Sequence, residues 1–309
     1  MRIVSLLPAA TEIVSELGAL QSLVGVTHEC DWPLAVRTLP RVTSSGVDGL
    51  AHAGTVDAQV RALASVGAPL FTLNAALIAS LAPDIVITQA LCDVCAVSET
   101  EVRALAHRLP SAPKVVTLNA TRLDAVFEDI ALVAAAIDAA DEAAELLAGL
   151  RARMRHVHET LKAARAPRPR VAVIEWTDPV FAAGHWVPEM VKRAGGVDAL
   201  ATSGAHSVTI TAQQVRDAEP EVLFVSPCGY DASRAHAEAR VLLARDEWEW
   251  ARERAVWALD ANGLVSRPGP RLVTGIEAMA AAMHPALFPA PAPAHARRAR
   301  DWPTPTPHG

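Results

Sequence analysis

The sequence predicts an α/β protein of two lobes, each built on a mostly parallel sheet, joined by a single long backbone helix. Short apolar strands alternate with helical segments in both halves, a pattern typical of parallel sheets. Between the halves, residues 121–166 are rich in Ala, Leu, Glu and Arg and hold no Pro, which favours helix. At about 1.5 Å per residue, Asp141 to Arg165 would form a rod on the order of 37 Å long. The same pattern allows a break between Asp138 and Asp141.

The N-terminal lobe is expected over residues 1–120. Pro8 suits a first helical position and Gly18 a helix end, and Ser98 with Glu101 forms a capping box. The expected strands are Arg2–Leu7, Leu23–Thr27, Leu70–Leu73, Ile85–Thr88 and Lys114–Leu118. The expected helices are Ala9–Leu17, Thr55–Val66, Asn74–Leu81 and the segment from Ser98 to Leu109.

The C-terminal lobe is expected over residues 167–288, where the alternation restarts. Its expected strands are Val171–Glu175, Glu221–Ser226 and Val256–Leu259. Its expected helices are Trp186–Ala194, Thr211–Ala218, Ala232–Arg254 and Arg271–Met283. The remaining residues, 289–309, are rich in Pro, Ala and Arg. Because such a segment can bury little apolar surface, we expect a disordered tail.

Bulk composition limits the class of partner. The 309 residues carry a formal net charge of −6 and are 51% hydrophobic, so the chain can bury a core but offers no basic surface for nucleic acid. We expect a monomer. No apolar run reaches the roughly 18 residues that span a bilayer, and no signal-peptide pattern precedes the first expected strand. The sequence as written therefore predicts a cytoplasmic protein; a mis-assigned start codon would instead make it periplasmic.

Chemically distinctive side chains follow the expected strands. Ligands of open parallel sheets bind at the carboxyl ends of the strands. His28, Cys30 and Asp31 follow one strand of the first lobe, and Cys92 with Cys95 follow another. In the second lobe, the residues that follow strands are Trp176, Asp178, His185, Trp186, Cys228 and Tyr230. Two lobes facing each other would gather these loops into one cleft.

The aromatic residues of these loops suggest a planar ligand. Trp176 and Trp186 lie in a loop punctuated by Pro and Gly, and flat apolar rings suit the wall of a pocket for a large planar molecule. Burial of both rings in the core is the alternative. His28 and His185 suit either metal ligation or a turn, while His206 suits an ordinary surface role.

The four cysteines suggest two alternative functions. Reduced thiolates in a cytoplasmic chain are better metal ligands or nucleophiles than disulfide partners. Cys30, Cys92, Cys95 and Cys228 would together provide a site for zinc or an iron–sulfur cluster. The other alternative is a cysteine-dependent enzyme using one of these thiols, although the chain lacks the GxSxG, P-loop, GxGxxG and HExxH motifs.

Several of these segments carry a family resemblance. Ser5–Glu12 and Leu23–Thr27 resemble the opening of the helical-backbone substrate-binding proteins, the receptors for cobalamin, iron-siderophores and haem that serve ABC importers. His28–Pro33, Cys92–Ser98, Glu175–Pro188 and Ser266–Arg271 look like the cobalamin-binding branch. The resemblance covers about residues 1–288.

This resemblance implies a function without catalysis. Members of the family have two α/β lobes joined by a long helix and bind ligand between them. The resemblance therefore implies a corrinoid such as cobalamin, or a related metal-containing tetrapyrrole, with Trp32, Trp176 and Trp186 against the ring. His28, Asp31, Asp178, His185 and Tyr230 are the further expected ligand-binding residues. It also implies an ABC permease as partner, with Asp198 as a docking acid.

Overall fold

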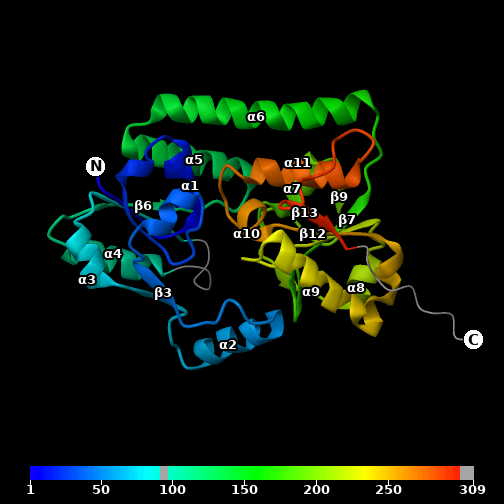
Figure 1. Ribbon diagram of the computed structural model, residues 1–309, viewed down its shortest axis with the longest axis horizontal. Helices are drawn as coiled ribbons and strands as arrows, with labels where there is room; N and C mark the ends of the chain where they lie inside the picture. The colour runs from blue at the N-terminus through cyan, green and yellow to red at the C-terminus, as the bar shows by residue number, and fades with distance from the viewer. Residues whose placement is uncertain (91–96, 300–309) are drawn as a thin grey trace, which may run out of the picture. The chain divides into compact units, whose positions relative to one another are not determined.

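The computed structural model describes residues 1–90 and 97–299, and the chain divides into two compact units (Figure 1). Unit 1 comprises Met1–Ala51, Thr55–Leu150 and Pro268–Pro270; unit 2 comprises His52–Gly54, Arg151–Arg267 and Arg271–Gly309. Each holds a sheet with parallel strands flanked by helices, so the predicted α/β class is confirmed. No helix in the described ranges combines the length and apolarity needed to cross a bilayer.

Unit 1 is built on a four-stranded parallel sheet of order β2-β1-β5-β6. Its strands are β1 (Ile3–Ser5), β2 (Leu23–Val26), β5 (Ile85–Gln89) and β6 (Lys114–Leu118). Helices α3 (Ala75–Leu81) and α4 (Glu99–Arg108) supply Ile78, Val102 and Leu105 to a core cluster with Val4 and Val86. Helices α1 (Pro8–Glu16) and α5 (Leu123–Ile137) pack against one another and lie on the opposite side of this sheet (Figure 1).

Local signals account for the helix starts of unit 1. Pro8 opens α1 at its first turn, where the missing N–H costs nothing. Asn74 caps α3 by accepting the N–H of Leu77 at 3.0 Å, and Ser98 caps α4 by accepting the N–H of Glu101 at 3.2 Å. Two short 3-10 helices, η1 (Leu20–Ser22) and η2 (Leu34–Thr38), flank β2.

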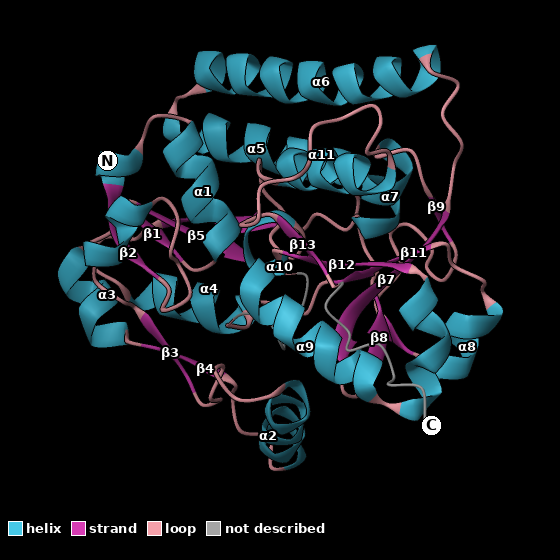
Figure 2. Ribbon diagram, turned by 45° about the vertical axis from the view of Figure 1, so that its right-hand side comes forward, coloured by secondary structure: helices cyan, strands magenta, loops and turns pink. Residues whose placement is uncertain are grey.

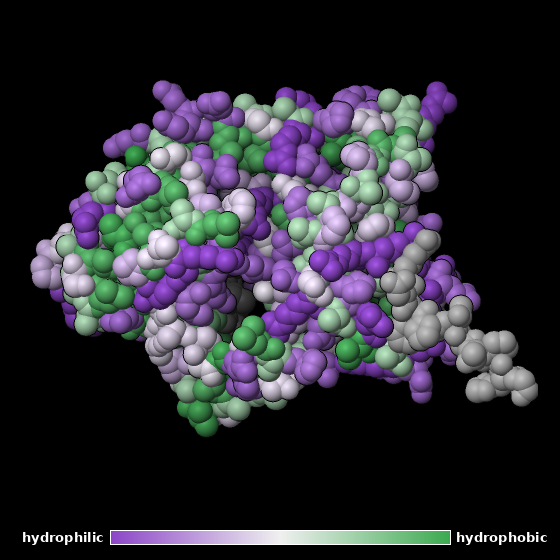
Figure 3. Space-filling view, viewed as in Figure 1, coloured by the Kyte–Doolittle hydropathy of each residue, from purple (hydrophilic) through white to green (hydrophobic). Residues whose placement is uncertain are grey.

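A peripheral layer of unit 1 was predicted in part: the sequence predicts its helix and one of its strands, but neither strand β3 nor the pairing of the two strands. Strands β3 (Thr43–Ser45) and β4 (Phe71–Leu73) form a separate antiparallel pair, and helix α2 (Ala53–Ser65) lies between them in sequence with only Ala53 buried. Hydrophobic side chains gather at the surface over α2 and the loops at its ends (Figure 3), where Leu50 and Val66 are 88% and 76% exposed.

Residues 121–166 form two helices, with a break close to the position, between Asp138 and Asp141, where the sequence allows one in the expected connecting helix. Helix α5 ends where Asp138 adopts a left-handed conformation (φ 57°, ψ 42°) and donates its N–H to the carbonyl of Ala134. Such a residue satisfies the last carbonyls and stops a helix. Helix α6 (Ala140–Ala163) then begins, and the chain passes from unit 1 to unit 2 within it, after Leu150.

Unit 2 is built on a seven-stranded mixed sheet of order β10-β8-β7-β11-β12-β13, with β9 also paired to β7. Its parallel centre consists of β7 (Arg170–Thr177), β11 (Val222–Val225) and β12 (Ala255–Leu259). The shorter strands are β8 (Val180–Ala182), β9 (Val197–Asp198), β10 (Val208–Thr209) and β13 (Ala296–Arg298).

Helices cover both faces of the second sheet (Figure 2). On one face, α8 (Ala212–Asp217), α9 (Ala232–Ala244) and the 3-10 helix η3 (Asp246–Glu253) enclose a core that includes the fully buried Trp248. On the other face, α7 (Val187–Arg193) and α11 (Leu272–Met283) pack together. The short helix α10 (Ala261–Leu264) follows β12, capped by Asp260.

The C-terminal segment differs from the expected disordered tail. Residues 296–298 form strand β13, which pairs antiparallel with β12 and buries Ala296 to 4% exposure. Hydrogen bonding to β12, a strand distant in the sequence, holds these residues in an ordered strand. The amino-acid composition of the segment does not indicate this pairing. Residues 300–309 lie outside the described ranges.

Candidate ligand-binding site

Two aromatic side chains meet at the carboxyl edge of the parallel strands of unit 2. Trp176 lies at the end of β7 and Tyr230 in the turn after β11, and these two strands are parallel neighbours. Their ring centroids are 5.6 Å apart at an interplanar angle of 67°, an edge-to-face contact that aromatic pairs favour. The indole N–H of Trp176 donates to the carbonyl of Asp178 at 3.0 Å. This half-buried indole is therefore held in one orientation.

An arginine covers the Tyr230 ring. The guanidinium carbon of Arg234 lies 3.5 Å from the ring centroid, the geometry of a cation–π contact. Asp231 caps α9 by accepting the N–H of Arg234 at 2.8 Å, which places Arg234 in the first turn of that helix. Burial raises the pKa of the Tyr230 phenol, and Arg234 opposes that change. The phenol therefore remains a neutral group.

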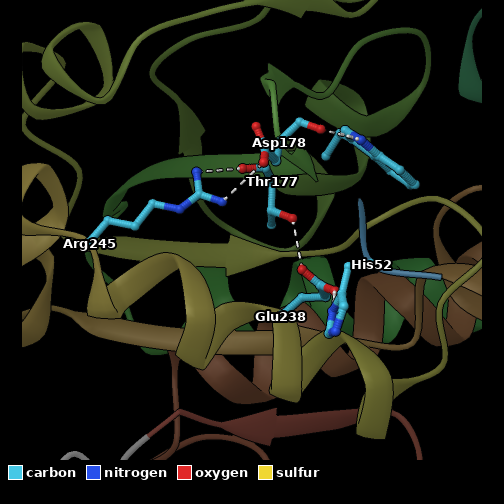
Figure 4. A network of polar contacts seen from close by, with 6 residues as sticks. His52, Thr177, Asp178, Glu238 and Arg245 are labelled. Carbon is cyan, nitrogen blue, oxygen red and sulfur yellow. Dashed lines mark hydrogen bonds and ion pairs between the residues drawn. The ribbon is translucent and has the colours of Figure 1, made fainter. Parts of the chain in front are cut away.

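A polar network surrounds Thr177 and Asp178 at the end of β7 (Figure 4). The buried Thr177 hydroxyl donates to Glu238 Oε2 at 3.1 Å, and Arg245 donates to the Thr177 carbonyl at 3.1 Å. Arg245 also lies 3.7 Å from the exposed Asp178 carboxylate, and Glu238 lies 3.5 Å from His52. These contacts anchor the end of β7 to helix α9. No motif in the sequence indicates Glu238 or Arg245, because only folding brings the α9 segment next to the end of β7.

His185 and His206 form a second cluster in unit 2. His185 Nε2 and His206 Nδ1 are 3.3 Å apart, and the ring centroids are 5.1 Å apart at 89°. Burial lowers the pKa of His185, and the neighbouring His206 lowers it further. His206, expected to have an ordinary surface role, is thus the partner of a predicted site residue.

Two predicted site residues have other roles. Trp186 is only 5% exposed and donates its indole N–H to the Val265 carbonyl at 2.7 Å, so it is a satisfied core residue rather than a pocket wall. Asp198 does not fit an open docking acid. One of its carboxylate oxygens accepts the N–H groups of Leu200 and Ala201, each at 2.9 Å. The other is buried without a hydrogen-bond partner in the described part of the chain, and burial raises the pKa of this carboxyl.

In unit 1, His28 lies in the loop after β2 and is held by Thr43 of strand β3. Its Nδ1 lies 2.7 Å from the Thr43 hydroxyl, and its ring lies 5.3 Å from that of Phe71. Burial lowers the pKa of His28, and Arg41 adds to the effect. Asp31 is half-buried beside Trp32, which is 42% exposed.

Only two of the four cysteines of the expected metal site lie within the described residues. Cys30 is 1% exposed, and its sulfur lies 3.1 Å and 3.2 Å from the hydroxyls of Thr11 and Thr27. It is thus packed into the loop rather than presented as a ligand. Cys228 is exposed, while Cys92 and Cys95 lie outside the described residues. Within the described ranges, no group of three or more His, Cys, Asp or Glu side chains is placed to hold a metal ion.

Sequence comparison places the chain in a family. The family described as "Periplasmic binding protein" matches residues 3–262. The chain belongs to the periplasmic binding protein family. The family resemblance predicted from the sequence is therefore confirmed, and so is the general role of a substrate-binding protein.

Individual relatives agree with this assignment. The chain is 24% identical over 299 residues to the uncharacterized ABC transporter substrate-binding lipoprotein YvrC of Bacillus subtilis (strain 168), covering 93% of this chain and 81% of that protein. It is 24% identical over 277 residues to the vitamin B12-binding protein of Vibrio cholerae, covering 89% and 86%. The fold matches that of a periplasmic heme-binding protein from Pseudomonas aeruginosa with a TM-score of 0.72, 22% identity, and coverage of 96% and 97%.

The expected cytoplasmic location is wrong. This periplasmic binding protein has relatives that are periplasmic proteins or a lipoprotein, and such proteins act outside the cytoplasm. The first residues, Ile3–Ser5, form the buried strand β1. These residues form part of the sheet, so their sequence does not indicate whether the protein is exported.

Proposed function

We propose that this periplasmic binding protein is the receptor of an ABC importer and that its ligand is a corrinoid or a related metal-containing tetrapyrrole. The observation that carries the proposal is the oriented pair of Trp176 and Tyr230 at the carboxyl edge of β7 and β11. Support also comes from the relative in Vibrio cholerae that is named a vitamin B12-binding protein.

The chemistry of this edge suits a large planar molecule with a polar rim. The half-buried Trp176 indole offers an apolar surface, and its N–H is already satisfied by Asp178, so contact with an apolar ring leaves no donor unpaired. The exposed Asp178 carboxylate is a hydrogen-bond acceptor next to this surface. A corrinoid carries amide groups around its ring, and their N–H groups would donate to such an acceptor.

Haem is the second candidate. The Arg234 guanidinium lies against Tyr230, and a guanidinium recognises carboxylates in a fixed fork geometry. Haem carries two carboxylates at its rim, whereas cobalamin carries amides. The Arg234 side chain therefore favours haem, and the Asp178 side chain favours the corrinoid.

Calorimetric titrations with cyanocobalamin and with haemin test the two ligands separately. We expect saturable binding of cobalamin near 1:1 at micromolar affinity or better, and weakening by roughly 1–3 kcal/mol in Trp176→Ala, the scale of burying one large side chain. A matched control is Trp250→Ala. Trp250 packs against the same core as Trp176, but η3 precedes β12 and so lies at the amino end of that strand.

The outcomes separate the ligands. Binding of haemin with a flat cobalamin titration would assign the site to haem. Flat titrations of both ligands on folded protein would refute the proposal. Equal losses in Trp176→Ala and Trp250→Ala would show that the effect comes from stability rather than from contact with the ligand.

A further inference from the structure

We propose that His185 and His206 form a two-imidazole site for a borderline divalent transition-metal ion of the zinc, nickel and copper class. The two side chains come from separate loops of unit 2, before α7 and before β10. The inference goes beyond the proposed function, because the ion is bound by protein imidazoles and needs no organic chelate.

The distance between the two nitrogens fits a shared ion. Imidazole binds zinc at about 2.0–2.1 Å, so two ligands of a tetrahedral ion have nitrogens roughly 3.4 Å apart. His185 Nε2 and His206 Nδ1 are 3.3 Å apart. The same contact also meets the geometry of a hydrogen bond when one of the two nitrogens carries a proton, and an ion would take the place of that proton.

The orientation of the rings points the same way. Two imidazoles that point straight at one another with this separation would have centroids roughly 5.6 Å apart, because each nitrogen lies on the line between the rings. The centroids of His185 and His206 are 5.1 Å apart, and the ring planes cross at 89°. The shorter centroid distance means that each ring is tilted away from the line that joins the two nitrogens. The lone-pair directions of the two nitrogens can then meet at a point beside that line. An ion shared by the two would occupy that point.

The backbone holds the pair in place. The His185 N–H donates to the Ala205 carbonyl at 2.6 Å, and the Gly204 N–H donates to the His185 carbonyl at 2.9 Å. Gly184 permits this close crossing, since a Cβ there would lie 2.5 Å from the Ala205 oxygen. His185 itself has φ +53°, a left-handed conformation that is sterically unfavourable for a non-glycine residue. Strain of this kind concentrates at ligand sites, where the surrounding contacts maintain it.

Carboxylates flank the same loop. Glu175 accepts the Ser207 hydroxyl at 2.8 Å, and Glu189 accepts the Ser203 hydroxyl. Two imidazoles fill half of a tetrahedral set, which leaves the remaining positions for water or for donor groups of a bound molecule.

Titration with ZnCl2 tests the site directly. Tag-free protein, stripped with chelator, desalted and kept reduced, is titrated in a calorimeter without any corrinoid. We expect His206→Gln to bind one zinc equivalent fewer than the wild type, or to bind that equivalent at least tenfold more weakly. His185→Asn, which retains a residue that tolerates positive φ, should show the same loss. The control His158→Gln changes an imidazole on α6 that is 68% exposed and should match the wild type.

Identical zinc stoichiometry and affinity in the wild type and His206→Gln would overturn the proposal. Thermal unfolding of each variant shows whether it remains folded. Titration of the wild type with CoCl2 gives a second readout, since tetrahedral cobalt has strong visible bands that a hydrogen-bonded pair without the ion does not produce. Cobalamin titrations depend on Trp176 and zinc titrations on the histidines, so the failure of one proposal is distinguishable from the failure of the other.

Discussion

The Trp176 indole and the Tyr230 phenol ring meet edge to face, with centroids 5.6 Å apart. Trp176 ends one parallel strand, and Tyr230 follows its neighbour. The sheet therefore fixes the spacing between two rings that are 54 positions apart in the chain. Because Tyr230 is only 3% exposed, it supports the indole from beneath.

Tyr230→Ala should both destabilise the protein and weaken corrinoid binding. Removing a buried aromatic ring costs about 3–5 kcal/mol, and Trp176 loses its edge contact. Tyr230→Phe retains the ring and should stay close to the wild type in both respects. Urea unfolding and cobalamin titration measure the two effects. A Tyr230→Phe variant as impaired as Tyr230→Ala would show that the hydroxyl, not the ring, matters.

Arg234→Ala should distinguish a carboxylate-bearing ligand from an amide-bearing one. If haem binds, loss of the guanidinium should weaken affinity by about 1.5–3 kcal/mol, the value of a hydrogen bond to a charged group. If cobalamin binds, its affinity should change little, while loss of the contact with Tyr230 should cost about 0.5–1 kcal/mol of stability. Parallel titrations of Arg234→Ala and Arg234→Lys with both ligands check this. An equal loss for both ligands would contradict it.

Thr177 and Glu238 should be energetically coupled. Both are buried, and the Thr177 hydroxyl donates to the carboxylate at 3.1 Å. A double-mutant cycle of Thr177→Val and Glu238→Leu should give a coupling free energy of about 1–2 kcal/mol. Urea unfolding of the four proteins measures it. Additive effects would indicate that the hydrogen bond contributes nothing to stability.

The protein should lose stability as the pH falls below about 6.5. Burial lowers the pKa of His284 from the usual 6.5. As the pH falls, the unfolded chain therefore takes up this proton before the folded protein does, and unfolding becomes more favourable. His284→Gln should make the free energy of unfolding decline less steeply between about pH 7 and 5, whereas the exposed control His158→Gln should not. The slopes come from urea unfolding at several pH values, and equal slopes for the wild type and His284→Gln would exclude this contribution.

Asp138→Gly should stabilise the protein. Asp138 has φ 57° at the end of α5, and glycine adopts this conformation without the steric cost of a Cβ. The expected gain is about 0.5–1 kcal/mol. Asp141→Gly, in the first turn of α6, should instead destabilise by a similar amount. Thermal unfolding compares the two, and a loss in Asp138→Gly would contradict the expectation.

Local signals in the sequence predicted much of the fold. Pro8, Asn74 and Ser98 start helices at the expected places, because caps and turns depend on neighbours in the chain. The alternation of strands and helices predicted the α/β class for the same reason. The helix break at Asp138 was compatible with the pattern but not specified by it.

Long-range contacts explain what the sequence left out. Strand β13 pairs with β12, and no local pattern in a Pro- and Ala-rich segment indicates such a partner. Trp186 follows a strand as a ligand-binding residue would, yet its N–H reaches Val265. The contact of His206 with His185 depends on the crossing of two loops. These placements depend on tertiary structure rather than on the residues nearby.

Strand β13 has a practical consequence for anyone who shortens the chain. It occupies the outer side of β12, is only three residues long and carries Arg297 and Arg298. Short charged edge strands discourage sheets of different molecules from joining. A protein truncated at residue 288 would leave the backbone N–H and C=O groups of β12 open along a row that includes Val256 and Leu259. We expect such a protein to self-associate and precipitate during purification, even if each remaining core stays intact.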